Sequence, residues 1–240
     1  MRTEVGWVIM NIEYDIIYSL GTDCACAEYM KKNNLRAVSG PFDWLNHTDF
    51  RTRMNCILND FKDFFNKEDL KFLPKDPGSA FGNDYSHDYY ENTRNSFYYF
   101  HDFPAGVPFD KVFGAVKKTY NRRIRRFKKM LKTKRRVLLV WFAHYYRTDD
   151  SEIIALCDLV CRKYNKTIDF LIIEHSENQM VPEKRLLAPN ILRIDVHTNG
   201  KQDGVPAFLG KECVVSPLFA SYRLHVPWAK RILKIFSSRK

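Results

Sequence analysis

The sequence has no uninterrupted apolar run approaching the roughly 18–20 residues that a membrane-spanning helix requires, so we expect no transmembrane segment. Glycine-rich phosphate cradles are also missing. Neither G-x-G-x-x-G nor the P-loop pattern occurs, which leaves nucleotide binding by those routes without support. There is no G-x-S-x-G elbow and no D-x-D motif, so the usual signatures of α/β-hydrolases and of sugar-nucleotide transferases are absent.

The sequence also has no disulfide pattern and no convincing signal peptide. The N-terminal apolar stretch is short and is flanked by Glu4 and Glu13. We therefore expect a cytoplasmic protein with reduced thiols. The pair Cys24-x-Cys26 is too tight for a zinc knuckle, and no histidine pair accompanies the other cysteines, so we expect no metal and no cofactor. The six cysteines are scattered along the chain: Cys24, Cys26, Cys56, Cys157, Cys161 and Cys213.

Positive charge is abundant, with 39 Lys and Arg against 28 Asp and Glu and a net charge of +11. Twelve basic residues and no acid lie between Lys117 and Arg136. Such a segment favours anionic partners, either a phosphate-bearing substrate or an anionic membrane surface. Nucleic acid is not favoured, because no helix-turn-helix, zinc-finger or RNA-recognition signature accompanies the charge.

The order of elements predicts a single α/β domain over 1–240, with a mostly parallel sheet flanked by helices. Within it we distinguish a strand–turn–helix and Pro-Phe-Asp-Trp segment (14–68), an aromatic-rich loop and hairpin insertion (about 69–108), and a basic helix (109–136). A second-half sheet (137–215) and a basic amphipathic tail (227–240) follow. The tail could dock on its own domain or lie on an anionic membrane.

Individual elements follow from apolar periodicity. Helices are expected from the cap Thr48 to about Phe65, over 109–132 and over 150–164. Strands are expected at 137–142, 168–173 and 191–196, with a possible fourth at 213–215. In the long basic helix, Arg123 lies at the edge of the apolar stripe, so it either pairs with a carboxylate or binds an anionic ligand.

The segment from Ile16 to Lys32 is the most informative. A short apolar strand leads through the turn Gly21-Thr22-Asp23 into a helix that begins at Cys24. A cysteine in the first turn of a helix meets unpaired N–H groups and the positive end of the helix dipole, which lower the pKa of a thiol. Cys24 is therefore a candidate nucleophile, while a small buried cysteine remains the alternative.

A thiol nucleophile needs a base, and that base needs a group that orients it. His101, at the end of a predicted strand, is the preferred base, with His47 and His144 as secondary candidates. Either Asp102 or Asp43 could orient the ring. Asp102 would need a turn to reach it, because adjacent strand residues point to opposite faces. Asp43 would be partly buried and would need a partner such as Arg36. The other histidines are expected at the surface or in loops: His87, His175, His197 and His225.

These segments together resemble a bacterial family of unknown function that is labelled as papain-like cysteine peptidases. The resemblance rests on Tyr18-Ser19-Leu20-Gly21, Cys24, Leu35-Arg36, Gly40-Pro41-Phe42-Asp43-Trp44, His101-Asp102-Phe103 and the Tyr120–Phe127 region, and it spans about residues 14–175. It implies a Cys24–His101 pair with an acid nearby. The chain departs from papain itself, because no aromatic residue follows the cysteine and a second-half sheet is added.

The resemblance implies a thiol-dependent hydrolase or acyl transferase. The genes of this family resemble genes of cell-envelope polysaccharide synthesis in their genomic context. This motivates an alternative, a cytoplasmic transferase at the inner face of the membrane, and a non-catalytic binding module is the third possibility. Arginine side chains would grip phosphate in the transferase. The candidate substrate-binding residues are Gly21, Arg36, Trp44, Arg122, Arg123 and Arg126.

Overall fold

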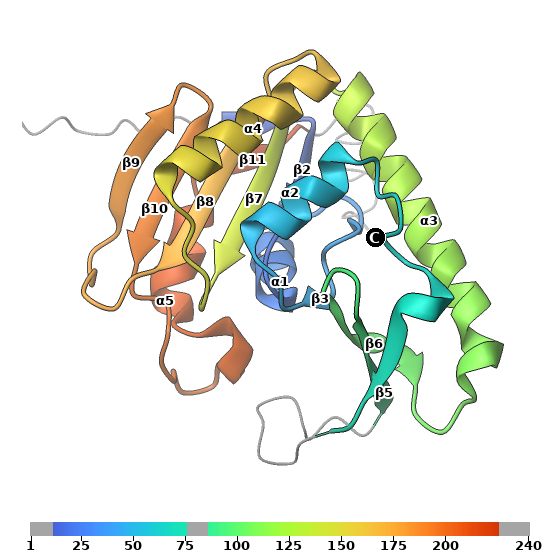
Figure 1. Cartoon of the computed structure of the whole chain (residues 1–240). Coiled ribbons are helices and arrows are strands. Elements are labelled where there is room, and N and C mark those ends of the chain that lie inside the picture. Colours follow the sequence, from blue (N-terminus) through green and yellow to red (C-terminus); the bar gives the residue numbers. More distant parts are fainter. Residues whose placement is uncertain (1–11, 76–85, 226–240) are drawn as a thin grey trace, which may run out of the picture.

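A computed structural model describes residues 12–75 and 86–225. Its centre is a five-stranded sheet in the order β2-β7-β8-β10-β9 (Figure 1). Four of these strands run parallel, and the edge strand β9 is antiparallel to β10. Their bounds are β2 Ile16–Ser19, β7 Val137–Ala143, β8 Asp169–His175, β9 Glu183–Ala188 and β10 Ile191–Val196.

A second sheet stands beside the first in the order β3-β6-β5-β4, and all of its pairings are antiparallel. It comprises β3 Leu45–Asn46, β4 Leu70–Leu73, β5 His87–Asn92 and β6 Tyr98–Pro104. Two short strands, β1 Ile12–Tyr14 and β11 Tyr222–Leu224, pair in parallel. The α/β class is thus confirmed, whereas the mostly parallel arrangement applies to four strands of the central sheet only.

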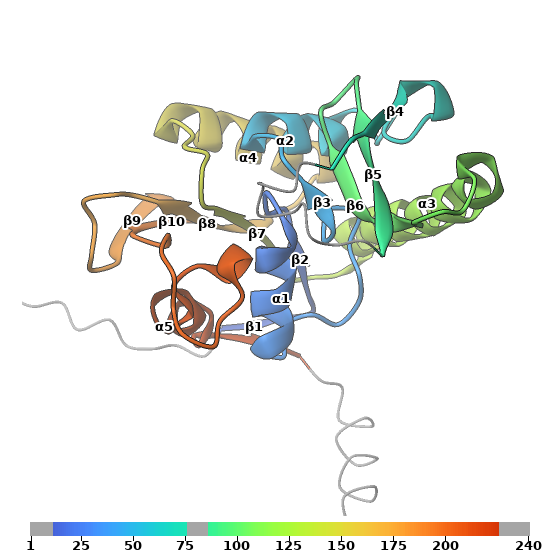
Figure 2. The ribbon, with the colours of Figure 1, turned by 90° about the horizontal axis from the view of Figure 1, so that it is seen from below.

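Helices cover both faces of the central sheet (Figure 2). On one face lie α2 Phe50–Leu58 and α4 Asp150–Tyr164; on the other lie α1 Cys24–Lys32 and α5 Glu212–Val215. The long helix α3, Phe109–Thr133, flanks the second sheet. None of the helices within 12–75 and 86–225 combines the length and apolar character needed to cross a bilayer.

The sequence of β7 shows why helices cover both faces of the central sheet. All seven of its residues are buried. Val137, Leu139 and Trp141 pack into the cluster under α2 and α4, while Leu138 and Phe142 pack into the cluster around α1. Alternate strand residues face opposite sides, so a continuous apolar strand needs cover on both.

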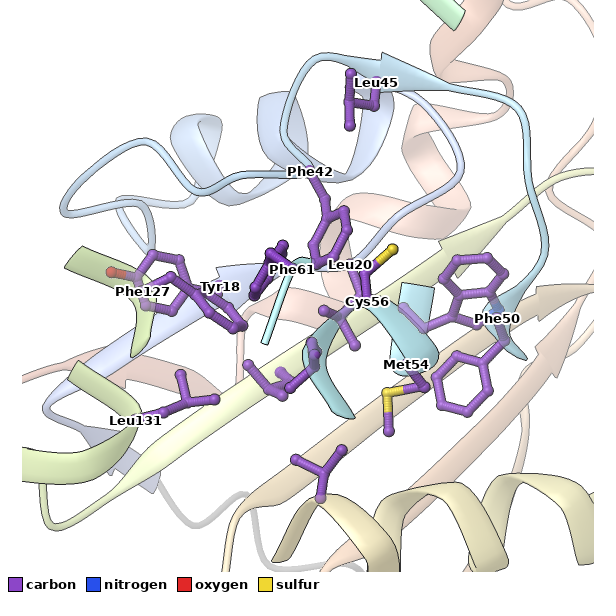
Figure 3. Packing of buried hydrophobic residues seen from close by; sticks show 14 of the residues in the cluster. Tyr18, Leu20, Phe42, Leu45, Phe50, Met54, Cys56, Phe61, Phe127 and Leu131 are labelled. Atoms are coloured by element: carbon purple, nitrogen blue, oxygen red, sulfur yellow. The ribbon is translucent and has the colours of Figure 1, made fainter. Parts of the chain in front are cut away.

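The larger cluster joins the two sheets through the Pro-Phe-Asp-Trp loop. Figure 3 shows Phe42 pointing into the cluster beside Phe61 and Leu20. The Phe42 ring centre lies 5.5 Å from that of Phe61 and 6.3 Å from that of Phe127 on α3. Burying aromatic rings of this size contributes strongly to holding the loop between α3 and the central sheet.

Several element boundaries differ from the sequence-based expectation. The helix expected to run from Thr48 to Phe65 is capped by Asp49 and ends at Leu58, after which Asp60, Phe61 and Asp63 adopt left-handed conformations. The strand expected at 213–215 is wrong, because α5 occupies 212–215. The antiparallel strand β9 was not expected. The basic tail at 227–240 lies outside the described residues.

Candidate functional site

The carboxyl ends of β2, β7, β8 and β10 meet at one edge of the central sheet, where ligands bind in open α/β folds. Three cavities lie along this edge, of about 470, 390 and 270 Å³. Tyr145, which follows β7 and is 80% exposed, lines all three. We call the largest the α1 pocket; it is lined by Thr22, Asp23, Asn46, His47, Tyr98, Phe100, Tyr145 and Tyr146.

The α1 pocket lies at the N-terminus of α1 because the turn before that helix is tight. A Cβ added at Gly21 would lie 2.4 Å from Cys26 Cβ, so only glycine allows the strand to pass this close to the helix. Asp23 is the N-cap, and its Oδ1 accepts a hydrogen bond from the Ala25 N–H at 2.8 Å. Gly21 thus has a packing role in placing Asp23 at the pocket, whereas Cys24, the next residue, is not among the residues that line it.

Cys24 begins α1, as the sequence predicts, but its thiol is not activated. The side chain is buried, and burial raises its pKa to about 12, with the Asp23 and Glu28 carboxylates adding to the shift. The expected lowering by the helix dipole is therefore outweighed by desolvation. In the resting protein the sulfur carries its proton.

The carboxyl of Asp23 has an unusually high pKa for a residue that caps a helix. Burial raises the pKa of its carboxyl to about 6, against the opposing influence of the Ala25 N–H and the Arg53 guanidinium. A carboxyl with this pKa exchanges its proton near neutral pH, and perturbed groups of this kind cluster at functional sites. Asp23 was not singled out from the sequence, where it reads as a turn residue.

His101 lies in β6, where it is exposed next to Trp44 and His87, with ring centres 6.1 and 6.3 Å away. Its neighbour in the strand, Phe100, lines the α1 pocket. Asp102 accepts a hydrogen bond from the Tyr120 hydroxyl at 2.7 Å, and burial raises the pKa of the Asp102 carboxyl. The histidine that lines the pocket beside Asp23 is His47.

Asp43 is held inside its own loop. The Arg36 Nε donates to Asp43 Oδ2 at 2.8 Å, which confirms the expected partner, and the Gly40 N–H donates to the same oxygen at 3.0 Å. Burial raises the pKa of the Asp43 carboxyl despite these contacts. The Arg36 guanidinium lies 5.2 Å from the Trp44 ring centre. These three candidate residues thus support one another in shaping the loop.

The three arginines expected to grip phosphate do not face one direction. Arg122 is exposed on α3. Arg123 lies 5.2 Å from the Tyr120 ring centre and is partly buried. Arg126 donates from Nη2 to the Ser39 carbonyl at 2.5 Å. Only Arg122 presents its charge to solvent, so a shared phosphate site for all three would require rearrangement.

A buried ionic network lies at the same sheet edge, behind the cavities. Arg193 is 2% exposed and donates to Glu174 Oε2 from Nη2 at 2.8 Å. Glu174 is fully buried and also accepts from Trp141 Nε1 at 2.9 Å. Asp195 lies within 3.1 Å of Arg193 Nε. This network fixes the strand ends from which the cavity-lining loops leave.

One group of three within the described residues could bring metal ligands together: His175, Glu177 and His197 offer atoms within 4.8 Å of one another. His175 was expected at the surface but is buried. Its Nδ1 accepts the Thr198 N–H at 3.0 Å, which places the ring proton on Nε2, 3.1 Å from Glu177 Oε1. A nitrogen that carries a proton has no lone pair for a cation, so this hydrogen-bond pattern does not fit a metal.

Asn46, Tyr145 and Tyr146 were missed by sequence reasoning. The two tyrosines follow β7 after one residue, His144, and the rule that ligands bind at the carboxyl ends of parallel strands could have found them. Asn46 belongs to the second sheet. Its position beside Asp23 depends on how the two sheets pack, which no local pattern indicates.

Comparison with known proteins supports the resemblance stated above. The model of a family described as "Putative papain-like cysteine peptidase" matches residues 15–178, more than half of the 240 residues. No curated protein and no solved structure gives a significant match. The matched region contains α1 with Cys24, the Pro-Phe-Asp-Trp loop, β6, α3 and the parallel strands β2, β7 and β8. The chain therefore belongs to this papain-like cysteine peptidase family.

Proposed function

We propose that the chain is a thiol-dependent hydrolase or acyl transferase that acts in the α1 pocket, with Cys24 as the nucleophile. The observation that carries the proposal is the position of Cys24 in the first turn of α1, next to the pocket-lining Asp23, in a family labelled for cysteine peptidase chemistry. The aromatic walls of the pocket suit an acyl group with an apolar side chain.

The raised pKa of Cys24 determines the form of the reaction. Because the resting sulfur is a thiol, a base has to remove its proton as it attacks, rather than start from a thiolate–imidazolium pair. We propose His47 as this base, since it lines the pocket and its Nδ1 lies 2.5 Å from the Tyr146 hydroxyl. With Nδ1–H donated to Tyr146, Nε2 keeps the lone pair that accepts a proton.

In the proposed step, His47 Nε2 takes the proton from Sγ while a sulfur lone pair forms a C–S bond with the acyl carbon. The carbonyl π electrons move to oxygen. Collapse of this intermediate breaks the bond to the leaving group, which takes the proton back from the imidazolium. Water then releases the acyl group in a hydrolase, or another acceptor takes it in a transferase.

The test compares Cys24→Ser with Cys213→Ser, because Cys213 is an exposed cysteine that does not belong to the pocket lining. With N-acetyl-phenylalanine p-nitrophenyl ester as substrate, we expect kcat/KM to fall at least about 100-fold for Cys24→Ser and to stay unchanged for Cys213→Ser. Full activity in Cys24→Ser would overturn the proposal, and an absence of activity in the parent protein would leave a non-catalytic binding module.

Two histidine variants decide between the candidate bases. His47→Ala should lower kcat about 100-fold or more, whereas His101→Ala should have a small effect. The reverse result would restore the base that the sequence favours, His101, with Asp102 or Asp43 to orient it.

A second candidate function, a transferase at an anionic membrane surface, is favoured by one observation on α3. Five exposed basic residues follow one another at helical spacing, and no ion pair with any of them occurs within the part of the chain that the structure describes: Lys118, Arg122, Arg125, Lys129 and Lys132. Each such residue near an anionic bilayer contributes about 1 kcal/mol at moderate salt.

We expect the chain to float with vesicles that contain phosphatidylglycerol and not with pure phosphatidylcholine vesicles. Replacement of the five residues by Gln should abolish flotation and leave the thermal unfolding temperature unchanged. The transferase further predicts thermal stabilisation by sugar nucleotides that persists in Cys24→Ser. Absence of both effects would remove this candidate.

A further inference from the structure

The α1 pocket combines one carboxylate with walls of aromatic rings. Its lining contains Asp23 and, among the described residues, no Lys or Arg, although the whole chain has a net charge of +11. Much of the remaining lining is ring surface, from Tyr98, Phe100, Tyr145 and Tyr146. The only full charge in the lining is therefore opposite in sign to the net charge of the chain.

Four of the rings form a continuous arc. Tyr98 and Phe100 are two residues apart in β6, so they face the same side of the second sheet, and their ring centres are 5.7 Å apart. The His47 ring centre lies 4.7 Å from that of Tyr98 and 6.0 Å from that of Tyr146. Aromatic ring faces carry partial negative charge, so a cation beside this arc is attracted to more than one ring.

One oxygen of Asp23 is free to meet a ligand. Oδ1 accepts the Ala25 N–H at 2.8 Å, whereas no residue within 12–75 and 86–225 donates to Oδ2. The buried side-chain atoms that lack both a partner and access to solvent include the two polar atoms of Asn46 but neither oxygen of Asp23. Because Asp23 lines the pocket and is 9% exposed, its free oxygen keeps contact with the pocket space.

The positive group nearest in effect does not neutralise Asp23. Arg53 on α2 lowers the pKa of Asp23, but it is fully buried, and it donates to the carbonyls of Leu45 and His47, at 3.2 and 2.8 Å, and to Thr48 Oγ1 at 3.1 Å. Burial outweighs Arg53 and holds the pKa of Asp23 at about 6, so at neutral pH the carboxyl is ionised but poorly solvated. Such a carboxylate attracts a cation into the pocket and repels an anion.

We propose that the α1 pocket binds an organic cation, a primary or methylated ammonium group, through the Asp23 carboxylate and the arc of rings. The methylene or methyl groups of this cation are apolar and pack on the rings, while its charge meets the carboxylate. The inference goes beyond the proposed function, since it assigns a charge to the ligand and holds whether or not the Cys24 thiol reacts. Where the thiol does react, an acyl substrate with an ammonium group is preferred to a neutral one.

The test uses probes of the same shape that differ in charge. Choline is compared with neohexyl alcohol, in which a carbon atom replaces the nitrogen, by ligand-observed NMR titration of the full chain and of its Cys24→Ser variant. We expect choline to bind about 10-fold more tightly than the alcohol in both proteins. N-acetyl-lysinamide is compared in the same way with N-acetyl-homonorleucinamide, in which a methyl group replaces the ammonium group.

Asp23→Asn keeps the helix cap and removes the charge, so we expect the preference for choline to fall to about 3-fold or less. The matched control is Asp49→Asn, because Asp49 caps α2 by accepting the Thr52 N–H at 2.8 Å and is outside the lining of the α1 pocket. Its preference should stay at about 10-fold. Tyr98→Leu removes one ring face and should lower the preference for choline without abolishing binding of the alcohol.

Three results would overturn the inference: equal affinity for the charged and neutral probes in the parent protein, no binding of either cation at millimolar concentration, or a preference for choline that is unchanged in Asp23→Asn. A larger preference for choline than for the lysine derivative supports a small quaternary ammonium ligand, and the reverse supports a cationic peptide side chain. Charge-selective binding by a chain that has no thiol chemistry would overturn the proposed function alone. Thiol chemistry in a chain that binds charged and neutral probes equally would overturn this inference alone.

Discussion

The buried carboxyl of Asp23 gives a quantitative prediction about stability and pH. Its pKa rises from 3.8 in the unfolded chain to about 6 in the folded protein, chiefly through burial. Between these values the folded state holds a proton that the unfolded state releases, so this group lowers stability as pH rises through the interval. A difference of about 2 pKa units, at roughly 1.4 kcal/mol per unit, corresponds to about 3 kcal/mol.

Asp23→Asn removes this penalty and keeps the cap, because an asparagine oxygen can accept the Ala25 N–H in the same way. We expect the variant and the parent protein to have similar unfolding free energies at pH 4. At pH 7.5 the variant should be more stable by about 3 kcal/mol. Urea unfolding followed by circular dichroism at several pH values measures this difference directly.

The matched control is Asp49→Asn. Asp49 caps α2 by accepting the Thr52 N–H at 2.8 Å, but it is exposed. Its variant should differ from the parent by the same small amount at both pH values. If the stability difference for Asp23→Asn is also independent of pH, the carboxyl titrates normally and the reasoning from burial is refuted.

For three further substitutions we expect a stability change of known direction. Arg193→Leu leaves the fully buried Glu174 without its cation, and we expect a loss of about 3–5 kcal/mol in the unfolding free energy, measured by urea titration. Gly21→Ala forces its Cβ to 2.4 Å from Cys26 Cβ, so the thermal unfolding temperature should fall by several degrees. Gly114→Ala, which meets no atom within 4 Å on α3, should raise that temperature slightly; a fall would contradict the helix assignment.

Local chemistry made much of the fold predictable. The helix 150–164 and the strand 191–196 have the predicted bounds, because their apolar periodicity is uninterrupted. The helix after Asp49 was overextended, since Phe61 and Phe65 continue its apolar spacing although the backbone has left the helix at Leu58. Phe61 lies in a turn, and its side chain is buried in the core. Its apolar character therefore indicates burial and not a helical backbone.

The site was predictable only where one segment forms it. The strand–turn–helix that presents Cys24 and the Arg36–Asp43 pair are short-range features, and the sequence shows both. The protonation of Cys24 depends on how deeply other segments bury it, and the residues around the start of α1 do not indicate that burial. Asn46 and His47 reach the pocket through the packing of one sheet beside the other, which no periodicity encodes.

The tyrosine shared by the three cavities has a mechanical consequence. Tyr145 lies two residues past the end of β7 and is 80% exposed, so its ring can change rotamer without disturbing the core. Any such rotation reshapes all three hollows in one movement. A molecule that binds in one cavity and holds the Tyr145 ring in one rotamer thereby sets the width of the other two cavities.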